Sequence, residues 1–423
     1  MTKKILITAS TFPRYSGDNT VDFVWHQARY LKKHYPDYEI HTLVPHDKGV
    51  KKFEVVEGVI IHRYAYFWPQ NWQTLVYPAI WPNIKESPLR LLQVPFLLLS
   101  MYFAARRVVK KQKIDLIYSH WFTPQGLVCH KVAQQNNIPH VLTSHAADII
   151  ILKKLPWIGR KLVRNILPQF EKISFAGSRG MAQALEFFSG EKQEQLRKKC
   201  QVLSMGVDLQ IPPLHSMAEE LQHKELKLLF IGRLAEKKGV TYLLNAMRLM
   251  KNNKKDVTLD LLGEGPLLNT IKNEVKQLDL VENVNFHGFV NGEDKFSFIN
   301  KSDLFVLPSI VTDDGDAEGL PVSLLEAMAA GALCCASDQS GAPDIVKADE
   351  NALLFEAKSA QALANVFEKV RVMTKTQKDV IKENARLCGE RYQWDNLIHE
   401  HAEYLFNLQT DAPHLKEKSV HAK

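Results

Sequence analysis

The chain has 423 residues, 45% of them hydrophobic and 24% charged, as is typical of a soluble globular protein, and its length predicts two domains. This composition excludes collagen-like, coiled-coil and disordered proteins, and five scattered cysteines exclude a disulfide framework or a zinc cluster. Residues 1–210 hold 29 Lys and Arg against 15 Asp and Glu, a balance of +14, whereas residues 211–423 hold 25 against 32, a balance of −7. A basic half joined to an acidic half predicts two modules, the first of which faces an anionic partner.

Short apolar runs alternate with longer segments of helical periodicity from the N-terminus onward. Val21–Lys33 and Gln125–Gln135 are two of the helical segments. Strands that alternate with helices of this length indicate parallel sheets covered by helices on both faces. In the first half, strands are expected at Lys4–Thr8, Glu39–Val44, Val59–Arg63, Ile114–Ser119, His140–Thr143, Lys172–Ala176 and Gln201–Ser204.

The second half repeats the same alternation. We therefore predict an α/β protein with two doubly wound domains, over residues 1–206 and 207–391. A terminal helix is expected over residues 392–409 and a frayed tail over residues 410–423. In the second half, strands are expected at Lys227–Ile231, Thr258–Leu262, Val284–His287, Leu304–Leu307 and Leu333–Ala336.

The most informative stretch follows the strand that is expected to end at Leu307. An acidic loop comes next, and a helix is expected to begin near Pro321, where its first free amides form an anion site. Glu318 in the loop suits a polyhydroxylated group, and Glu326 inside the helix suits the vicinal hydroxyls of a ribose. The alternative is that Glu318 is a solvated loop charge and Glu326 a helix-surface acid.

Two cations follow the first strand of the second half. Arg233 comes directly after the strand, and Lys238 precedes the next helix. Cations at such a crossover can clamp a diphosphate and stabilise it as a leaving group. The alternative is an ordinary basic loop. The acidic loop with Asp313, Asp314 and Asp316 lacks the register of an EF-hand, so no metal site is predicted.

Four motifs together resemble the family-four glycosyltransferases, which have the GT-B fold. These are Glu318-x7-Glu326 with GLP and EAMAAG around it, Gly-Arg-Leu-x3-Lys-Gly at 232–239, Leu262-Gly-Glu-Gly-Pro266 and Phe286-His-Gly288. The resemblance implies two domains facing a cleft, with a C-terminal helix that returns to the first domain. It also implies transfer of a sugar from a nucleoside-diphosphate sugar with retention of configuration, without a metal or other cofactor.

The resemblance further implies roles for individual residues. Glu318 contacts the donor sugar, Glu326 contacts the ribose, and Arg233 and Lys238 hold the diphosphate. His145, in Ser144-His-Ala-Ala-Asp148, reaches the donor sugar or its leaving phosphate. The expected catalytic residues are thus His145, Glu318, Arg233 and Lys238. The expected donor-binding residues are Gly17, Arg233, Lys238, Gly263, Glu318, Gly319, Leu320, Val322, Ser323, Leu324 and Glu326.

The N-terminal half departs from the family pattern at two places. Ala146 stands where glycine is usual, and Gly17 alone remains of a loop that has paired glycines in many relatives. His120, which ends a strand, and Asp148 are candidates for the acceptor side. For His120 a structural role is the alternative.

Two segments of the basic half indicate a membrane surface. Phe67–Lys113 begins with aromatics and continues as an apolar run, and in Leu152–Arg164 cations flank Trp157. Aromatics beside clustered cations suit the interface of an anionic membrane. Because Gln93 and Pro95 interrupt the apolar run, it is expected not to span a bilayer, and a buried crossover helix is the alternative for its centre. We therefore expect a cytoplasmic protein, peripheral on the membrane.

The leading prediction is a retaining glycosyltransferase with a lipid-linked or polysaccharide-type acceptor. Within the same fold, a nucleotide-sugar epimerase or a sugar phosphorylase is the alternative. A non-catalytic sugar-binding or nucleic-acid-binding module is an alternative of another class. Nucleic acid is not expected as a partner, since the basic residues lie on apolar helical segments rather than among aromatics on a sheet face.

Overall fold

The computed structural model describes residues 3–406 except 16, 17, 19, 21, 78, 146, 209–224, 291, 314 and 340. The chain divides into two compact units. Met1–Gly206 and Leu397–Lys423 form the N-terminal unit, and Val207–Asn396 form the C-terminal unit.

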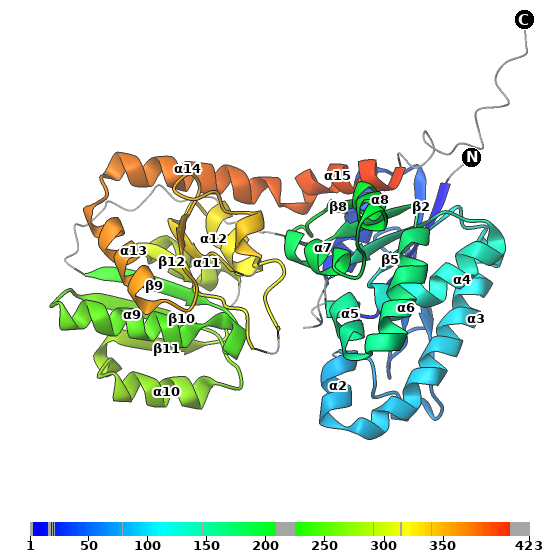
Figure 1. Ribbon diagram of the computed structural model, residues 1–423, viewed down its shortest axis with the longest axis horizontal. Helices are drawn as coiled ribbons and strands as arrows, with labels where there is room; N and C mark the ends of the chain where they lie inside the picture. The colour runs from blue at the N-terminus through cyan, green and yellow to red at the C-terminus, as the bar shows by residue number, and fades with distance from the viewer. Residues whose placement is uncertain are drawn as a thin grey trace, which may run out of the picture. The chain divides into compact units, whose positions relative to one another are not determined.

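The N-terminal unit contains an eight-stranded sheet in the order β3-β4-β2-β1-β5-β6-β7-β8. Figure 1 labels β2, β5 and β8 of this sheet, with helices such as α3, α4 and α6 beside it. Neighbouring strands are parallel except β3 and β4, which form an antiparallel hairpin. Glu57 and Gly58 at its turn both have positive φ, as a two-residue hairpin turn requires. The strands are β1 Lys3–Thr8, β2 Tyr38–Pro45, β3 Phe53–Val56, β4 Val59–Tyr64, β5 Leu116–His120, β6 His140–Ser144, β7 Lys172–Phe175 and β8 Cys200–Val202.

Helices cover both faces of this sheet. On one face, Leu97 of α3 packs in the same core cluster as Ile117 of β5. On the opposite face, Gln27 of α1 donates to the hydroxyl of Tyr118, the next residue of β5, at 3.2 Å. The helices are α1 Phe23–His34, α2 Ile80–Glu86, α3 Val94–Gln112, α4 Leu127–Asn136, α5 Ala147–Ile150, α6 Pro156–Ile166, α7 Ser178–Leu185 and α8 Glu191–Lys199.

A continuous helical stretch, Pro88–Gln112, combines a 3₁₀ turn with α3. By length and composition alone it is long and apolar enough to cross a membrane. Gln93 and Pro95 do not interrupt this stretch as predicted, because both lie at the junction of its two helical parts. That it does not span a bilayer stays a prediction. Leu97 and Met101 are nevertheless buried in the core of the unit, so one face of the stretch is already occupied by protein.

The C-terminal unit contains a six-stranded sheet, all parallel, in the order β11-β10-β9-β12-β13-β14. Alternate side chains of β9 enter two different cores: Leu228 and Phe230 on one face, Leu229 and Ile231 on the other. This alternation is the reason that the strand reads as a continuous apolar run. The strands are β9 Leu226–Ile231, β10 Val257–Leu262, β11 Val284–Gly288, β12 Leu304–Leu307, β13 Cys334–Ser337 and β14 Leu353–Phe355.

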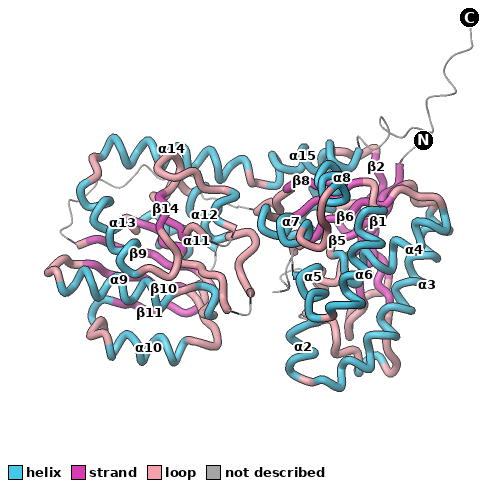
Figure 2. Tube along the Cα trace, viewed as in Figure 1, coloured by secondary structure: helices cyan, strands magenta, loops and turns pink. Residues whose placement is uncertain are grey.

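The helices of this unit lie on opposite faces of its sheet (Figure 2). Residues of α9, α10 and α13 share the core of Leu228, whereas residues of α11, α12 and α14 share the core of Leu229. The helices are α9 Val240–Asn252, α10 Leu268–Gln277, α11 Gly292–Lys301, α12 Val322–Ala329, α13 Ala360–Val372 and α14 Lys375–Arg391.

The last helix, α15 Trp394–Phe406, belongs to both units. At its start the Trp394 amide donates to the Val207 carbonyl oxygen at 3.1 Å. From Leu397 onward it packs in the N-terminal unit, where the Tyr404 hydroxyl donates to the Leu142 carbonyl oxygen at 3.1 Å. The polypeptide therefore passes between the units twice.

The predicted α/β class with two doubly wound parallel sheets is confirmed. Two strands were not expected. The β3 strand is an exposed edge strand, and β14 has three residues, too few to show periodicity.

Candidate functional site

The predicted donor site lies along one edge of the C-terminal sheet. Strands β9, β10 and β12 run parallel, so the residues that follow them meet at the same edge. Arg233 comes after β9, Gly263 after β10 and Ser309 after β12. The amide of Ile310 donates to the carbonyl oxygen of Lys237 at 2.8 Å, which joins two of these loops.

Lys238 and Glu318 form an ion pair at this edge, although 80 residues separate them in the sequence. Lys238 Nζ contacts Glu318 Oε1, and the Ser309 hydroxyl donates to Glu318 Oε2 at 2.8 Å. Both charged side chains are mostly buried, at 11% and 12% exposure. The carboxylate is therefore fixed in position, while Lys238 keeps further N–H donors for an anion.

Glu326 is held by a second cation. Lys295 of α11 donates to Glu326 Oε1 at 2.7 Å, and both side chains are 16% exposed. Lys295 was not predicted, because its contact with Glu326 depends on how α11 packs beside α12. Ser309 was not predicted either, although its hydroxyl follows β12 at the same sheet edge as the other site residues and could have indicated it.

The start of α12 differs from the prediction. The helix begins at Val322, after Pro321. The Val322 amide donates to Leu320 O at 3.1 Å and the Leu324 amide to Pro321 O at 3.0 Å, so these two are not the free anion donors that were predicted. Of the three expected amides, only that of Ser323 has no backbone acceptor within the described residues.

Arg233 and Gly319 remain open to a ligand. The Arg233 side chain is exposed, and among the described residues no acidic side chain pairs with it. A Cβ added to Gly319 would meet no atom within 4 Å. At this edge an exposed guanidinium group therefore lies on one loop, and unoccupied space adjoins a glycine of another.

Two other glycines are packed tightly at the same edge. At Gly263, with φ +149°, a Cβ would lie 1.9 Å from the Gly232 carbonyl oxygen. At Gly341 a Cβ would lie 1.4 Å from the Gly319 carbonyl oxygen. Only glycine allows these loops to approach so closely.

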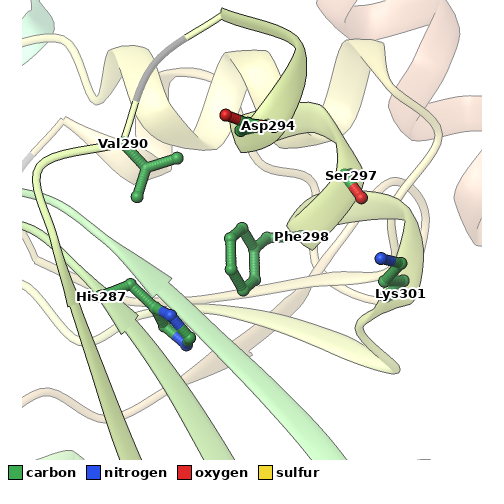
Figure 3. Close-up of a pocket in the computed structure, with 6 residues that line it drawn as sticks. All are labelled: His287, Val290, Asp294, Ser297, Phe298 and Lys301. Carbon is green, nitrogen blue, oxygen red and sulfur yellow. The ribbon is translucent and has the colours of Figure 1, made fainter.

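A pocket of about 320 Å³ opens between β11 and α11 (Figure 3). His287 of β11 faces Phe298 of α11, with ring centroids 4.5 Å apart, and His287 Nε2 bonds Asp260 Oδ1 at 2.7 Å. None of the predicted site residues lines this pocket. The lining residues are His287, Val290, Asp294, Ser297, Phe298 and Lys301.

His145 belongs to the N-terminal unit and lies in an aromatic cluster. Its ring centroid is 4.8 Å from those of Phe23 and Trp121. His145 Nε2 bonds His120 Nδ1 at 3.2 Å, so the structure brings these two predicted residues together. Burial lowers the pKa of His145 to about 3, which keeps the ring neutral near pH 7.

Asp148 anchors the loop that carries His145. Its carboxylate accepts from the Phe122 amide, from the Ser144 hydroxyl at 2.9 Å and from the His145 amide at 3.1 Å. The side chain is buried, and burial raises its pKa to about 6. These contacts orient His145 and leave Asp148 turned inward, which differs from the acceptor-side contact that was predicted.

Gly17, predicted to contact the donor, and Ala146 lie outside the described residues. Among the described residues nearby, Arg14 donates to both carboxylate oxygens of Asp18 at 2.9 Å and to Asp47 Oδ2 at 2.9 Å. In the part of the chain that the structure describes, no group of three or more His, Cys, Asp or Glu side chains could hold a metal ion.

Comparison with known proteins identifies the family. Residues 215–387 match the Glycosyl transferases group 1 family, and residues 21–211 match Glycosyltransferase Family 4. The chain is a family-four glycosyltransferase with the GT-B fold.

Several bacterial proteins named as glycosyltransferases are similar in sequence to this chain. A putative colanic acid biosynthesis glycosyltransferase of Escherichia coli is 28% identical over 60% of this chain and 60% of its own. An amylovoran biosynthesis glycosyltransferase of Erwinia amylovora is 32% identical over 40% of this chain and 41% of its own. The matches thus span about 40–60% of the lengths of these relatives.

Solved structures share the fold over nearly the whole chain. The sucrose-phosphate synthase of Thermosynechococcus elongatus superposes with a TM-score of 0.67 at 16% identity, covering 96% of this chain and 99% of its own. The Anabaena protein HepE, solved in complex with UDP, gives 0.64 at 16% identity, covering 95% and 99%. At this identity the likeness supports the fold alone.

Proposed function

We propose that this glycosyltransferase moves a sugar from a nucleoside-diphosphate sugar to a lipid-linked or polysaccharide-type acceptor, with retention of anomeric configuration. The observation that carries the proposal is the Lys238–Glu318 pair, held by Ser309 beside the open Arg233. A cation pair and a fixed carboxylate at a carboxyl sheet edge suit a diphosphate and the sugar attached to it.

In the proposed reaction the bond between the sugar C1 and the diphosphate oxygen breaks, and an acceptor hydroxyl oxygen bonds to C1 on the same face. The acceptor proton leaves with the diphosphate. Arg233 and Lys238 stabilise the negative charge that develops on the leaving group, so the proposal requires no metal. Glu318 orients the sugar hydroxyls, and Glu326 receives the ribose hydroxyls after exchanging its bond to Lys295. Neutral His145 donates or accepts a single hydrogen bond at the sugar.

The decisive experiment presents the purified protein with UDP-, GDP- and ADP-sugars and records hydrolysis in the absence of an acceptor. One donor should be consumed faster than the others, and NMR taken during the reaction should show release of the sugar with its original anomeric configuration. Chelation with EDTA should leave the rate unchanged. Inverted product, no consumption of any donor, or a requirement for free phosphate would contradict the proposal.

The class of acceptor is proposed from the relatives. The Escherichia coli and Erwinia amylovora proteins are named for the biosynthesis of colanic acid and of amylovoran, and a relative from Bacillus subtilis is named for teichuronic acid biosynthesis. These names support the proposal that this enzyme acts in polysaccharide assembly.

We also propose that the N-terminal unit attaches to an anionic membrane surface. Trp68 is 84% exposed, Leu92 69% and Trp157 75%, and Phe96 and Phe103 on the outer side of α3 are exposed too. Exposed apolar patches of this kind mark interaction sites. The balance of +14 in residues 1–210 complements anionic lipid headgroups, each cation near the surface contributing about 1 kcal/mol. Because the inner side of α3 is buried in the unit, the helix lies on the membrane.

The membrane proposal is tested by co-sedimentation with vesicles of anionic or neutral lipid at low and high salt. Binding should require anionic lipid and fall as salt rises, and Phe96→Ser with Trp157→Ala should weaken it. Val372→Ser is the control, because Val372 is an exposed apolar side chain of the C-terminal unit. Equal binding to both lipids at all salt concentrations, or no binding, would overturn the proposal without touching the enzymatic one.

A further inference from the structure

A line of buried polar side chains connects His145 with the last helix of the chain. Gln27 on α1, His120 at the end of β5 and His401 on α15 are each completely buried. All of them belong to the N-terminal unit, although more than 370 residues separate Gln27 from His401. A buried polar group destabilises the fold unless it is hydrogen-bonded, so every donor and acceptor in such a line needs a partner.

Each member of the line bonds the next. His401 Nε2 lies 2.9 Å from the Ser204 carbonyl oxygen, and His401 Nδ1 lies 2.6 Å from Gln27 Nε2. Gln27 Oε1 lies 2.8 Å from His120 Nε2, and His120 Nδ1 lies 3.2 Å from His145 Nε2. The line therefore runs without a gap from a backbone carbonyl to the ring of His145.

The carbonyl at one end fixes the direction of every bond. Because the Ser204 oxygen can only accept, His401 Nε2 carries a proton and its Nδ1 accepts from the Gln27 amide nitrogen. Gln27 Oε1 then accepts from His120 Nε2–H. His120 Nδ1 accepts in turn, so His145 donates through Nε2–H and its Nδ1 keeps a lone pair.

Two further observations agree with this direction. Gln27 Nε2 also donates to the Tyr118 hydroxyl at 3.2 Å, which leaves the Tyr118 proton for Thr143 Oγ1 at 2.6 Å. Burial lowers the pKa of His401 to about 4 and that of His120 well below its ordinary value. A neutral imidazole ring has one hydrogen-bond donor and one acceptor, and this is the combination that each histidine in the line requires.

We propose that Gln27 and His401 are positioning residues that fix the tautomer of His145 from the distant C-terminal helix. This inference rests on the proposed function, in which His145 meets the donor sugar or its phosphate. In this tautomer His145 Nδ1 accepts a hydrogen bond, which suits a hydroxyl group of the donor sugar or of the acceptor substrate. The site thus depends on a segment that lies at the other end of the sequence.

The tautomers can be read directly from ring ¹⁵N shifts of protein labelled at histidine. The rings of His145, His120 and His401, assigned through single substitutions, should each appear as the Nε2–H form near pH 7. His401→Phe and Gln27→Met remove the line, so the rings of His120 and His145 should become mixtures of both tautomers. An Nδ1–H form of His145 in the wild type would overturn the proposal, as would an unchanged His145 spectrum in both variants.

Kinetics supply the second readout. His401→Phe and Gln27→Met should lower kcat about 10- to 100-fold, the scale seen when an orienting outer partner is lost, with KM little changed. His401→Gln retains one donor and one acceptor and should recover most of the rate. His399→Phe is the matched control, since exposed His399 lies two residues away on the same helix.

The two proposals fail in distinguishable ways. If His145→Ala transfers sugar at the full rate, the role of His145 in the proposed function fails, while the ring ¹⁵N shifts still report whether the line fixes the tautomer. If His401→Phe is inactive and His401→Gln equally so, with both folded by urea titration, the line acts only as a packing element and the inference is wrong.

Discussion

At the scale of the residue, the site is built from charges held by specific partners. Lys238 and Glu318 are almost buried and paired, whereas the neighbouring Lys237 pairs with Asp316 at 3.1 Å on the surface. A buried pair that loses one member leaves an uncompensated charge, but a surface pair contributes little. The two adjacent lysines therefore provide a matched comparison.

Lys238→Ala should reduce the rate of sugar transfer by about 10²–10³, the scale of losing one contact to a developing anion. Lys237→Ala should stay within about twofold of the wild type. The measurement is donor consumption at saturating substrate, with the urea midpoint recorded for each variant. Equal rates for the two variants would contradict the role of Lys238.

Asp148 predicts a pH dependence of stability. Folding raises its pKa from 3.8 to about 6 through burial, so the folded protein binds this proton more tightly than the unfolded chain. The contribution of Asp148 is therefore full below about pH 4 and is lost as the pH rises through 6. The free energy of unfolding of the wild type minus that of Asp148→Asn should fall between pH 4 and pH 7. A flat difference for Asp148→Asn would contradict the prediction.

At the scale of the element, the loops of the site pack against one another at glycines, without room for a side chain. Gly341 touches the Gly319 carbonyl so closely that a methyl group has no room, whereas Gly319 itself faces open space. Substitution of Gly341 therefore tests how the loops pack, whereas substitution of Gly319 tests the space available to a ligand.

Gly341→Ala should displace the Gly319 loop and lower both the melting temperature and nucleotide affinity. Gly319→Ala should leave the melting temperature unchanged while weakening nucleotide binding, because the methyl group occupies the space left for the donor. Calorimetry for stability and titration with the preferred nucleoside diphosphate measure the two effects. A Gly341→Ala protein with wild-type stability would show that the loops can separate freely.

Most elements were predictable from the sequence, because buried parallel strands are continuous apolar runs. The exceptions have physical reasons: Phe53–Val56 is exposed at a sheet edge, and Leu353–Phe355 is too short. The motifs also located Glu318 and Lys238. They did not reveal Lys295 or His401, since the partner of each is chosen by packing between elements distant in sequence.

At the scale of the whole molecule, each unit has its own sheet and its own cores. The residues proposed to bind the donor along the β9, β10 and β12 edge all belong to the C-terminal unit. A ligand that binds the folded state stabilises it by about 2.7 kcal/mol at a hundredfold excess over Kd, and the effect is largest where it binds.

A nucleoside diphosphate should therefore slow hydrogen exchange in β9, β10 and β12 more than in β1, β5 and β6. Exchange followed by mass spectrometry, with and without the preferred nucleotide, measures this difference. The Lys238→Ala protein serves as the control and should show reduced protection. Equal slowing in both sheets would contradict a nucleotide site confined to the C-terminal unit.

The double passage of the chain between the units has a consequence for biosynthesis. A ribosome releases Gln27 and His120 early, but their partner His401 emerges only after the whole C-terminal unit has been made. Until then the surface of the nascent N-terminal unit that packs against α15 is uncovered, and Gln27 lacks its bond to His401. Domains generally fold in the order of their synthesis. Here the N-terminal unit is synthesised first but is completed only after the C-terminal unit. Truncating the gene before Leu397 should therefore yield a nascent chain that chaperones retain, even though the entire nucleotide site has already been translated.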